Sequence, residues 1–249
     1  MWRRKEKVEY EESLVTGKKL ARVENKPHPL PNYIVTISQP DAWLKFGEDK
    51  GIFYVDPLMV RQIDGEPLKG VSFYRGYLIL QSLGLRNLTD TEYNVVVSEN
   101  AQVAEQMRRF LIRTGFLKKV ERTKDGYTAM YIAIPKVERI GEGFEITGSE
   151  KRINLPPQGW FKVSQLLESE TGLPQITYEK IPCERCAYFW IREGQERPIL
   201  RGSWSWSPGT DRQFDIHANW ERPYSDIHVG IRAASNEKPR LRLPSMSYI

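Results

Sequence analysis

The chain has 249 residues with 37 basic and 32 acidic side chains, which gives a formal net charge of +5 at pH 7. This length is enough to bury a sizeable core in one large domain or two small ones. The charge excess is small, and the sequence lacks the residue spacing of a known nucleic-acid-binding module. No stretch approaches the roughly 18 apolar residues of a membrane helix. The charged N-terminal residues are not followed by the apolar core of a signal peptide. We therefore expect no membrane span and no signal peptide, and an intracellular or virion-associated protein. A basic protein that associates with nucleic acid is the least favoured interpretation, and it predicts binding that falls steeply with salt.

The N-terminal part of the chain is predicted to contain an arm followed by two strands. Residues 1–31 are rich in charge and end in a proline-rich run, which is typical of an arm or linker, and Val8 to Tyr10 favour a short edge strand within it. The β-branched residues of 33–37 predict the first strand of the folded part, and 52–55 predict the next. A folded domain is therefore expected to begin near residue 32.

Two helices are predicted in the next part of the chain. The first covers residues 71–83 and ends at Gly84, a residue type favoured directly after a helix. Thr89 and Glu92 have the spacing of a capping box, which predicts the start of a short second helix.

The segment 100–114 has the strongest helical pattern in the sequence. Its apolar residues recur at helical spacing, charged residues cover the opposite face, and Gly115 is expected to end the helix. The residues of the apolar face are Val103, Met107, Phe110 and Leu111.

Hairpins are predicted after this segment. Residues 118–123 and 127–134 flank the turn Lys124-Asp125-Gly126, and residues 137–140 and 144–146 flank a second turn that contains Gly141 and Gly143. Beyond Trp160 we expect short strands and long irregular loops. The sequence thus indicates an α+β fold with helices in the first half and functional loops in the second.

Cys183 and Cys186 form a Cys-x-x-Cys pair and are the only cysteines. Such a pair can be a redox centre, half of a zinc site or a small local disulfide. Residues 188–191 predict a strand after the pair, where a thioredoxin-like site would have a helix. This context favours a structural hairpin, with two thiols or one small disulfide.

Two segments far apart in the sequence resemble one known family. Residues 68–74 (LKGVSFY) and 83–93 (LGLRNLTDTEY) are similar to the part of formylglycine-generating-type C-type lectin domains in which GVSWYDA runs into GLRLPTEAEWE. Residues 200–204 (LRGSW) and 229–232 (VGIR) are similar to the RGGSW and NxGFR ending of the same domains. The resemblance implies a C-type lectin fold in which two helices pack on small antiparallel sheets and long irregular loops follow.

The resemblance does not extend to the residues that give the family its enzymatic and calcium-dependent functions. The formylglycine-generating enzymes bind copper with a cysteine pair between RGGSW and GFR, but no cysteine lies between Trp204 and Arg232. Sugar-binding lectins of this fold use Glu-Pro-Asn or Gln-Pro-Asp together with Trp-Asn-Asp, which residues 219–223 do not supply. We therefore expect a protein that binds a ligand without a cofactor and without catalysis.

A metal- or oxygen-dependent enzyme of the same superfamily is the alternative. His217 and His228 each end an Asp-Ile-His run, so with Asp215 or Asp226 they have the residue types of a 2-His-1-carboxylate site. Polar loop residues on a binding surface are the favoured interpretation, because no helical or strand spacing holds these side chains in a ligand set.

The final stretch most closely resembles the variable proteins of diversity-generating retroelements. In that group a reverse transcriptase rewrites adenines in asparagine codons, which yields residues such as Ser, Thr, Asp, Ile, His, Tyr, Phe and Asn but not Trp, Glu, Gln, Lys or Met. The resemblance implies these candidate variable, ligand-binding positions: Ser205, Ser207, Thr210, Asp211, Phe214, Asp215, Ile216, His217, Asn219, Tyr224, Asp226, Ile227 and His228. It implies these scaffold positions: Gly202, Trp204, Trp206, Trp220, Gly230 and Arg232.

Together these observations predict an arm over 1–31, a C-type lectin-like domain over 32–235 with a hypervariable binding region at 201–232, and a tail over 236–249. Tyr, His, Ser, Asp and Asn are the residue types of antibody paratopes, where aromatic rings supply contact area and small polar groups adapt. We expect a monomer whose partner is a protein or cell-surface ligand, from a prokaryotic, archaeal or viral source.

Overall fold

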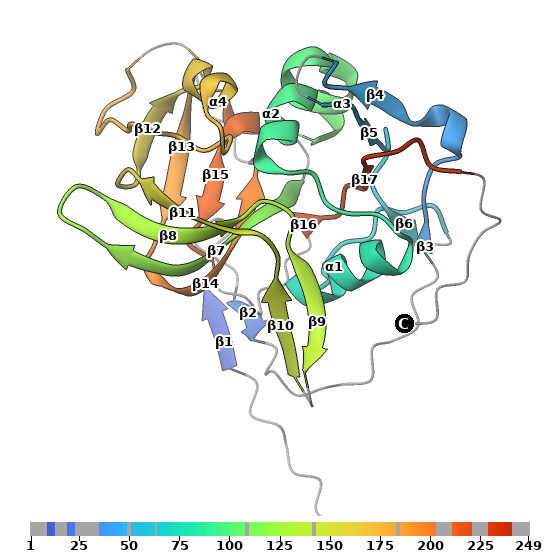
Figure 1. Cartoon of the computed structure of the whole chain (residues 1–249), viewed down its shortest axis with the longest axis horizontal. Helices are drawn as coiled ribbons and strands as arrows, with labels where there is room; N and C mark the ends of the chain where they lie inside the picture. The colour runs from blue at the N-terminus through green and yellow to red at the C-terminus, as the bar shows by residue number, and fades with distance from the viewer. Residues whose placement is uncertain are drawn as a thin grey trace, which may run out of the picture.

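A computed structural model of the chain describes residues 9–12, 19–22, 35–48, 51–62, 64–107, 110–140, 143–182, 185–202, 211–220 and 229–240. Within these residues the protein is a strand-rich α+β structure with four α-helices (Figure 1). The helices are α1 (Phe73–Ser82), α2 (Asp90–Glu99), α3 (Ala101–Met107) and α4 (Ser164–Glu168), with short 3-10 turns η1 (Pro40–Ala42) and η2 (Arg212–Phe214).

The strands of the first half are β1 (Glu9–Glu12), β2 (Lys19–Arg22), β3 (Val35–Thr36), β4 (Leu44–Phe46), β5 (Phe53–Val55), β6 (Arg61–Gln62), β7 (Leu111–Arg122) and β8 (Tyr127–Ile132). Those of the second half are β9 (Lys136–Ile140), β10 (Gly143–Thr147), β11 (Glu150–Leu155), β12 (Gly159–Lys162), β13 (Cys186–Ile191), β14 (Gly194–Arg201), β15 (Ile216–Ala218), β16 (Val229–Gly230) and β17 (Ala234–Ser235). Three of the four helices lie in the first half, as expected, but strands also occupy much of that half.

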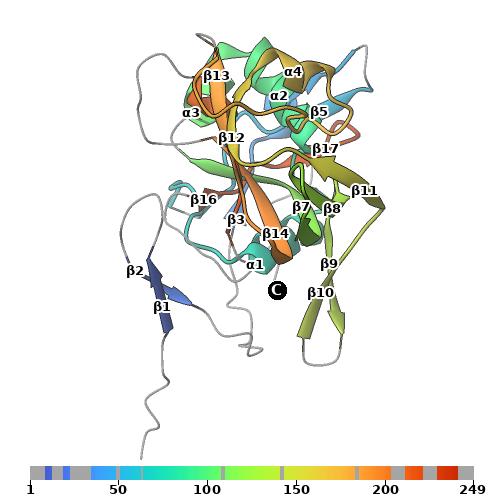
Figure 2. The same ribbon diagram turned by 90° about the vertical axis from the view of Figure 1, so that its left-hand side faces the viewer.

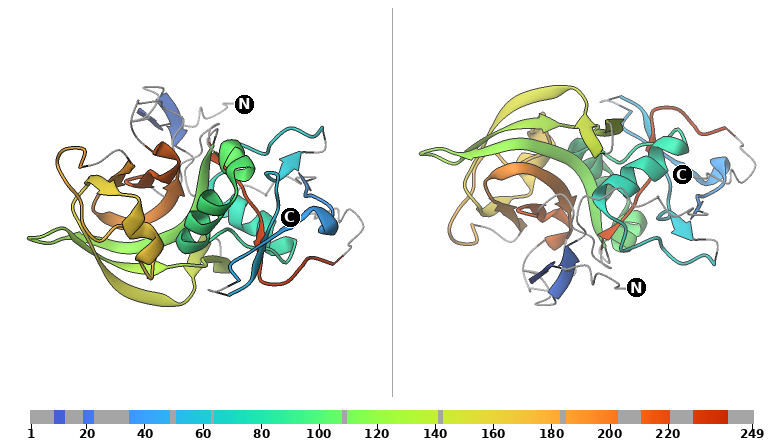
Figure 3. Two further views of the ribbon diagram at one scale, coloured as in Figure 1. Left: turned by 90° about the horizontal axis from the view of Figure 1, so that it is seen from above. Right: turned by 90° about the horizontal axis from the view of Figure 1, so that it is seen from below.

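The main sheet has eight strands in the order β11-β8-β7-β14-β15-β13-β12, with β16 paired to β7. It curls like half of a barrel when seen from above (Figure 3). The pairs β13·β15 and β16·β7 are parallel and the others antiparallel. This sheet is larger and more mixed than the small antiparallel sheets that the sequence led us to expect.

Helices α1 and α2 lie where the sequence predicts them. Helix α1 is followed by Leu83 and by Gly84 at φ +70°, the left-handed geometry that favours glycine after a helix. At the start of α2 the Thr89 side chain accepts a hydrogen bond from the Glu92 backbone N–H at 3.1 Å, and the Glu92 carboxylate accepts one from the Thr89 N–H at 2.9 Å. The predicted capping box is therefore present.

The prediction of one helix over residues 100–114 is wrong in its second half. Helix α3 covers only Ala101–Met107, and β7 begins at Leu111. The segment Leu111–Leu117 is buried at every position and pairs with strands from three other parts of the chain. Pairing with neighbouring strands therefore overrides the helical spacing of these residues, and Gly115 lies within a strand.

The predicted hairpins are confirmed. Strands β7 and β8 pair antiparallel across residues 123–126, with the Thr123 N–H donating to the Gly126 carbonyl at 2.9 Å. Strands β9 and β10 pair antiparallel, and their turn residues Gly141 and Glu142 lie outside the described part of the chain. Figure 2 shows this second hairpin projecting away from the main sheet.

Within the predicted arm, β1 and β2 pair antiparallel in a two-stranded sheet of their own. The described residues contain no helix long and apolar enough to cross a membrane. The largest hydrophobic cluster spans residues from Phe46 to Ala234, so the N- and C-terminal parts of the folded region share one core.

Candidate functional site

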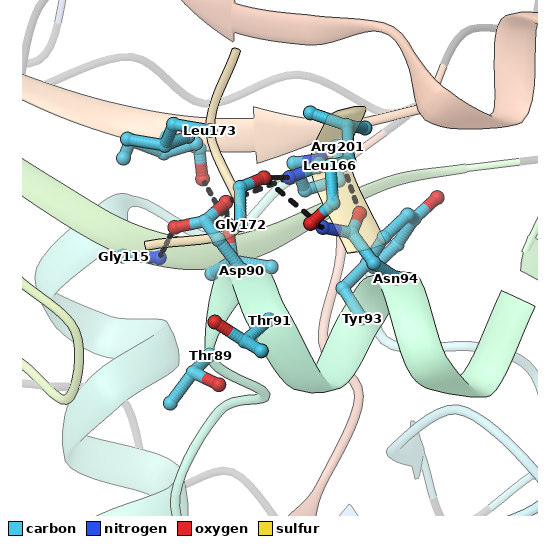
Figure 4. A network of polar contacts seen from close by, with 12 residues as sticks. Thr89, Asp90, Thr91, Tyr93, Asn94, Gly115, Leu166, Gly172, Leu173 and Arg201 are labelled. Carbon is cyan, nitrogen blue, oxygen red and sulfur yellow. Dashed lines mark hydrogen bonds and ion pairs between the residues drawn. The ribbon is translucent and has the colours of Figure 1, made fainter. Parts of the chain in front are cut away.

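A buried polar network joins helix α2 to the end of strand β14 (Figure 4). The Arg201 guanidinium donates to Asp90 Oδ1 at 3.1 Å and to Asn94 Oδ1 at 2.5 Å, and its Nη1 also reaches the Gly172 carbonyl at 3.2 Å. Both side chains of the Arg201–Asp90 ion pair are fully buried. A buried charge pair needs further hydrogen bonds to offset its loss of hydration, and the surrounding groups supply them.

The Asp90 carboxylate has three donors besides Arg201. Thr114 Oγ1 donates at 2.7 Å, the Tyr131 hydroxyl at 3.1 Å and the Gly115 N–H at 3.3 Å. Burial raises the pKa of Asp90, while the Arg201 charge and these hydrogen bonds act in the opposite direction. Asp90 was not singled out from the sequence, because its side-chain partners are residues 114, 131 and 201, which are distant in the sequence.

The two segments that carry the family resemblance meet at further points. A backbone bridge joins Lys69 to Gly230, and Ile231 packs in one cluster with Leu68 and Val71. Arg232 is fully buried and donates to the carbonyls of Asp56 and Pro57 at 2.9 and 2.7 Å. Residues 68–71 and 230–232 are therefore packed against one another in the interior.

The segment 211–220 forms a buried frame between two stretches, 203–210 and 221–228, that lie outside the described residues. At one end, the Gly202 N–H donates to the Asp215 carbonyl at 2.8 Å, and the Asp211 N–H donates to the Cys186 carbonyl at 2.8 Å. At the other, Trp220 packs in a buried cluster with Val229 and two further strand residues. The frame therefore fixes the points at which both stretches leave and rejoin the sheet.

Gly202, which is hydrogen-bonded to the frame at Asp215, has a backbone geometry that requires a glycine. Its φ is +91°, which strains any residue with a side chain, and an added Cβ would lie 3.2 Å from the Tyr93 hydroxyl oxygen. At Gly230 an added Cβ would lie 1.8 Å from Cε of Met59, so the end of that flexible side chain would have to move. The scaffold role of both glycines stays a prediction.

The candidate variable residues divide into three groups. Phe214, Asp215, Ile216 and His217 are buried, with at most 3 % exposure, so they line the interior and not a ligand-accessible surface. Asp211 and Asn219 are half-buried. The remaining candidates lie outside the described residues, as do scaffold residues Trp204 and Trp206: Ser205, Ser207, Thr210, Tyr224, Asp226, Ile227 and His228.

Asp215 and His217 are buried titratable residues of the frame. Asp215 Oδ1 accepts a hydrogen bond from the Tyr188 N–H at 2.8 Å, and burial raises the pKa of Asp215 to about 7. Burial lowers the pKa of His217 to about 4, so its imidazole is neutral at physiological pH. His217 Nε2 is buried without a hydrogen-bond partner.

The described residues contain no group of three or more His, Cys, Asp or Glu side chains arranged to hold a metal ion. Cys186 is disulfide-bonded, which agrees with the structural interpretation of the cysteine pair; Cys183 lies outside the described part. Arg185, next in the chain to Cys186, forms an ion pair with Asp211 at 2.9 Å. These contacts tie the start of β13 to the frame.

Comparison with known proteins finds no matching protein-family model, curated protein or solved structure.

Proposed function

We propose that this chain is a non-catalytic ligand-binding protein with a C-type lectin fold of the formylglycine-generating type. Residues 203–210 and 221–228 form its recognition surface, which a diversity-generating retroelement varies. The ligand is a protein or another cell-surface molecule. No cofactor takes part in this proposed function.

The observation that supports the proposal is the contact between the two segments of the resemblance. If the matches were unrelated turns, their residues would have no reason to meet. Instead Arg201 of one segment pairs with Asp90 of the other at 3.1 Å, and Gly230 bridges Lys69. These contacts between the two segments support the proposal.

The burial pattern sharpens which positions take part. A ligand cannot contact side chains that are buried in the frame, so Phe214, Asp215, Ile216 and His217 support the loops in this proposal. Recognition falls to the candidates in the two flanking stretches, with Asp211 and Asn219 at their margins. A rigid frame beneath the loops reduces the entropy that binding must overcome.

The first test is to sequence the gene's locus and many copies of the gene. The proposal expects a nearby reverse-transcriptase gene and a near-identical repeat of the codons for Trp204 to Arg232, with differences only at adenines of that repeat. Substitutions should concentrate in residues 203–210 and 221–228. Invariant loop codons and a locus without a repeat would overturn retroelement diversification.

A pair of asparagine substitutions tests the division between frame and loops in the purified protein. Phe214→Asn places a polar amide in the core and should lower the free energy of unfolding by about 3–5 kcal/mol. Tyr224→Asn makes the same kind of change in a proposed recognition loop and should alter it by less than about 0.5 kcal/mol. Urea unfolding measures both, and equal losses would contradict the assignment.

A metal-dependent enzyme remains the second candidate, and one observation favours it. His217 is neutral, buried and has an unpartnered Nε2, which is the form in which imidazole binds metal. His228 and Asp226 would have to complete the ligand set. Metal analysis of the purified protein decides between the candidates: stoichiometric metal that is lost in His217→Ala and His228→Ala variants would replace the binding proposal.

A further inference from the structure

An aromatic row crosses one end of the main sheet, outside the proposed recognition loops. Trp160 of β12 is directly paired with Tyr188 of β13 and bridged to Tyr178, and Trp190 of β13 is directly paired with His217 of β15. Directly paired residues point to the same face of a sheet. The ring centroids lie 5.0 Å apart for Trp160–Tyr188, 4.3 Å for Tyr188–Trp190 and 6.2 Å for Trp190–His217.

The outer part of this row is accessible to solvent. Tyr178 is 38 % exposed and Trp190 36 % exposed, while Trp160 and Tyr188 are half-buried and His217 closes the inner end. The alternate residues Phe161 and Phe189 are fully buried on the opposite, core-facing side of the same strands. Core packing thus accounts for Phe161 and Phe189 but does not account for the exposed rings of Tyr178 and Trp190.

Basic residues accompany the exposed rings. Lys162 follows Trp160 by two positions within β12, which is the spacing that keeps neighbouring side chains on one face of a strand, and Arg192 comes directly after the last residue of β13, two positions after Trp190. Both cations are exposed, and within the described residues neither makes an ion pair.

The combination of rings and unpaired cations favours an anionic, ring-bearing occupant. Two copies of this face packed on each other would bring Lys162 and Arg192 against like charges, which disfavours a homodimer. A purely apolar protein surface would leave both cations without a partner. Single-stranded nucleic acid supplies flat bases that stack on aromatic side chains and phosphates that pair with Lys and Arg.

We propose that the aromatic row binds single-stranded nucleic acid, with bases stacking on Trp160, Tyr178 and Trp190 and phosphates contacting Lys162 and Arg192. Such binding requires no sequence-specific hydrogen bonds, because every base has a stacking face. The inference does not depend on the proposed loop recognition, since these residues lie on β12, β13 and the segment that precedes β13. Net charge and motif spacing did not favour a nucleic-acid partner. They could not indicate the aromatic row, because its residues come from separate segments of the chain.

In the experiment, the full chain is titrated into a fluorescein-labelled oligothymidylate of about 15 nucleotides. Binding is measured by the anisotropy of the fluorescein and by the tryptophan fluorescence of the protein. Binding should quench tryptophan emission and weaken as salt rises. Trp190→Ala should weaken it about 5- to 100-fold, the range for loss of one stacked base. Trp190→Phe should restore most of the affinity, whereas Trp190→Leu, which is apolar but has no ring face, should not.

A matched charge reversal separates a specific contact from net charge. Lys162→Glu should weaken binding and reduce the slope of log affinity against log salt by about 0.7, the value for one phosphate contact in a single strand. Lys136→Glu makes the same change on β9, on an exposed lysine remote from the row (Figures 1 and 2), and should have a much smaller effect. Thermal unfolding of each variant checks that it is folded.

Three outcomes would overturn the proposal. The first is the absence of any binding at low salt by the folded wild-type chain. The second is an equal loss in Lys162→Glu and Lys136→Glu, which would indicate nonspecific attraction. The third is full retention of affinity in Trp190→Leu, which would point to an apolar protein-docking surface instead. Failure of the locus test leaves this proposal unaffected, so the two can fail separately.

Discussion

Asp215 shows how burial changes the chemistry of a single residue. Its carboxyl group is 2 % exposed, and its charged form has the Tyr188 N–H as a hydrogen-bond donor at 2.8 Å but no salt bridge among the described residues. Because loss of hydration disfavours the charged form, the pKa of Asp215 rises from 3.8 to about 7. The folded protein therefore resists ionising a group that ionises readily in the unfolded chain.

This difference predicts how stability depends on pH. The contribution of Asp215 is most favourable below about pH 4, falls as pH rises from 4 to 7 because only the unfolded chain releases the proton, and is constant above 7. Asp215→Asn keeps an oxygen that accepts from Tyr188 and removes the titration. At pH 8 we expect this variant to be more stable than wild type by up to about 4 kcal/mol, from 1.36 kcal/mol per pKa unit.

Urea unfolding of both proteins at pH 5 and pH 8 measures the effect. The difference in unfolding free energy between variant and wild type should grow with pH. A constant difference would show that Asp215 has an ordinary pKa in the folded protein.

At the scale of elements, helix α2 begins where a local signal and a tertiary contact coincide. Glu92 accepts from the Thr89 N–H as part of the capping box and also pairs with Arg86 at 2.6 Å. Arg86 in turn is bridged through its backbone to Ala234. The capping box therefore fixes the start of the helix and also orients a side chain that joins it to the C-terminal part of the domain.

Thr89→Ala should remove the side-chain oxygen of the cap and lower the free energy of unfolding by about 1 kcal/mol. Thr89→Ser retains that oxygen and is the control, expected to stay within a few tenths of a kcal/mol of wild type. Chemical denaturation of the two variants side by side makes the comparison. Equal behaviour of Ala and Ser would mean that the cap contributes nothing and that packing alone sets the helix start.

At the scale of the whole molecule, Arg201 and Asp90 connect elements that are 111 residues apart in the sequence. Helix α2 and strand β14 meet through this pair, and β14 carries the chain directly to the proposed recognition region. Arg201 also lies over the ring of Tyr93, with its guanidinium carbon 4.8 Å from the ring centroid. The network thus positions the end of β14 relative to the helix.

Arg201→Met should destabilise the protein by about 3–5 kcal/mol at pH 7, because it leaves a buried carboxylate without its counter-charge. The double variant Arg201→Met, Asp90→Asn should be less destabilised than the sum of the single variants, since no charge remains to be buried. The deficit of Arg201→Met should also shrink at low pH, where Asp90 takes up a proton. Additive losses in this double-mutant cycle would show that the two residues act independently.

The sequence by itself determined the local features. Gly84 after α1, the Thr89–Glu92 capping box and the turn at Gly126 each depend on residues within a few positions of one another, and each is present. Gly202 was named as a scaffold position from the family resemblance, and that role stays a prediction; its backbone has a geometry that few other residues adopt.

Only the tertiary structure decided the features that depend on distant partners. Residues 111–114 have helical spacing, yet they lie in a strand, because β14 and β16 pair with residues 111–113. Some of Phe214, Ile216 and Ile227 were expected to be buried from their alternation with polar residues, and Phe214 and Ile216 are, but the sheet also buries Asp215 and His217. The aromatic row likewise exists only because separate segments become neighbours. The spacing of hydrophobic residues and the residue types of a variable codon are properties of one segment of the chain. Burial and strand pairing depend instead on the other segments against which it packs.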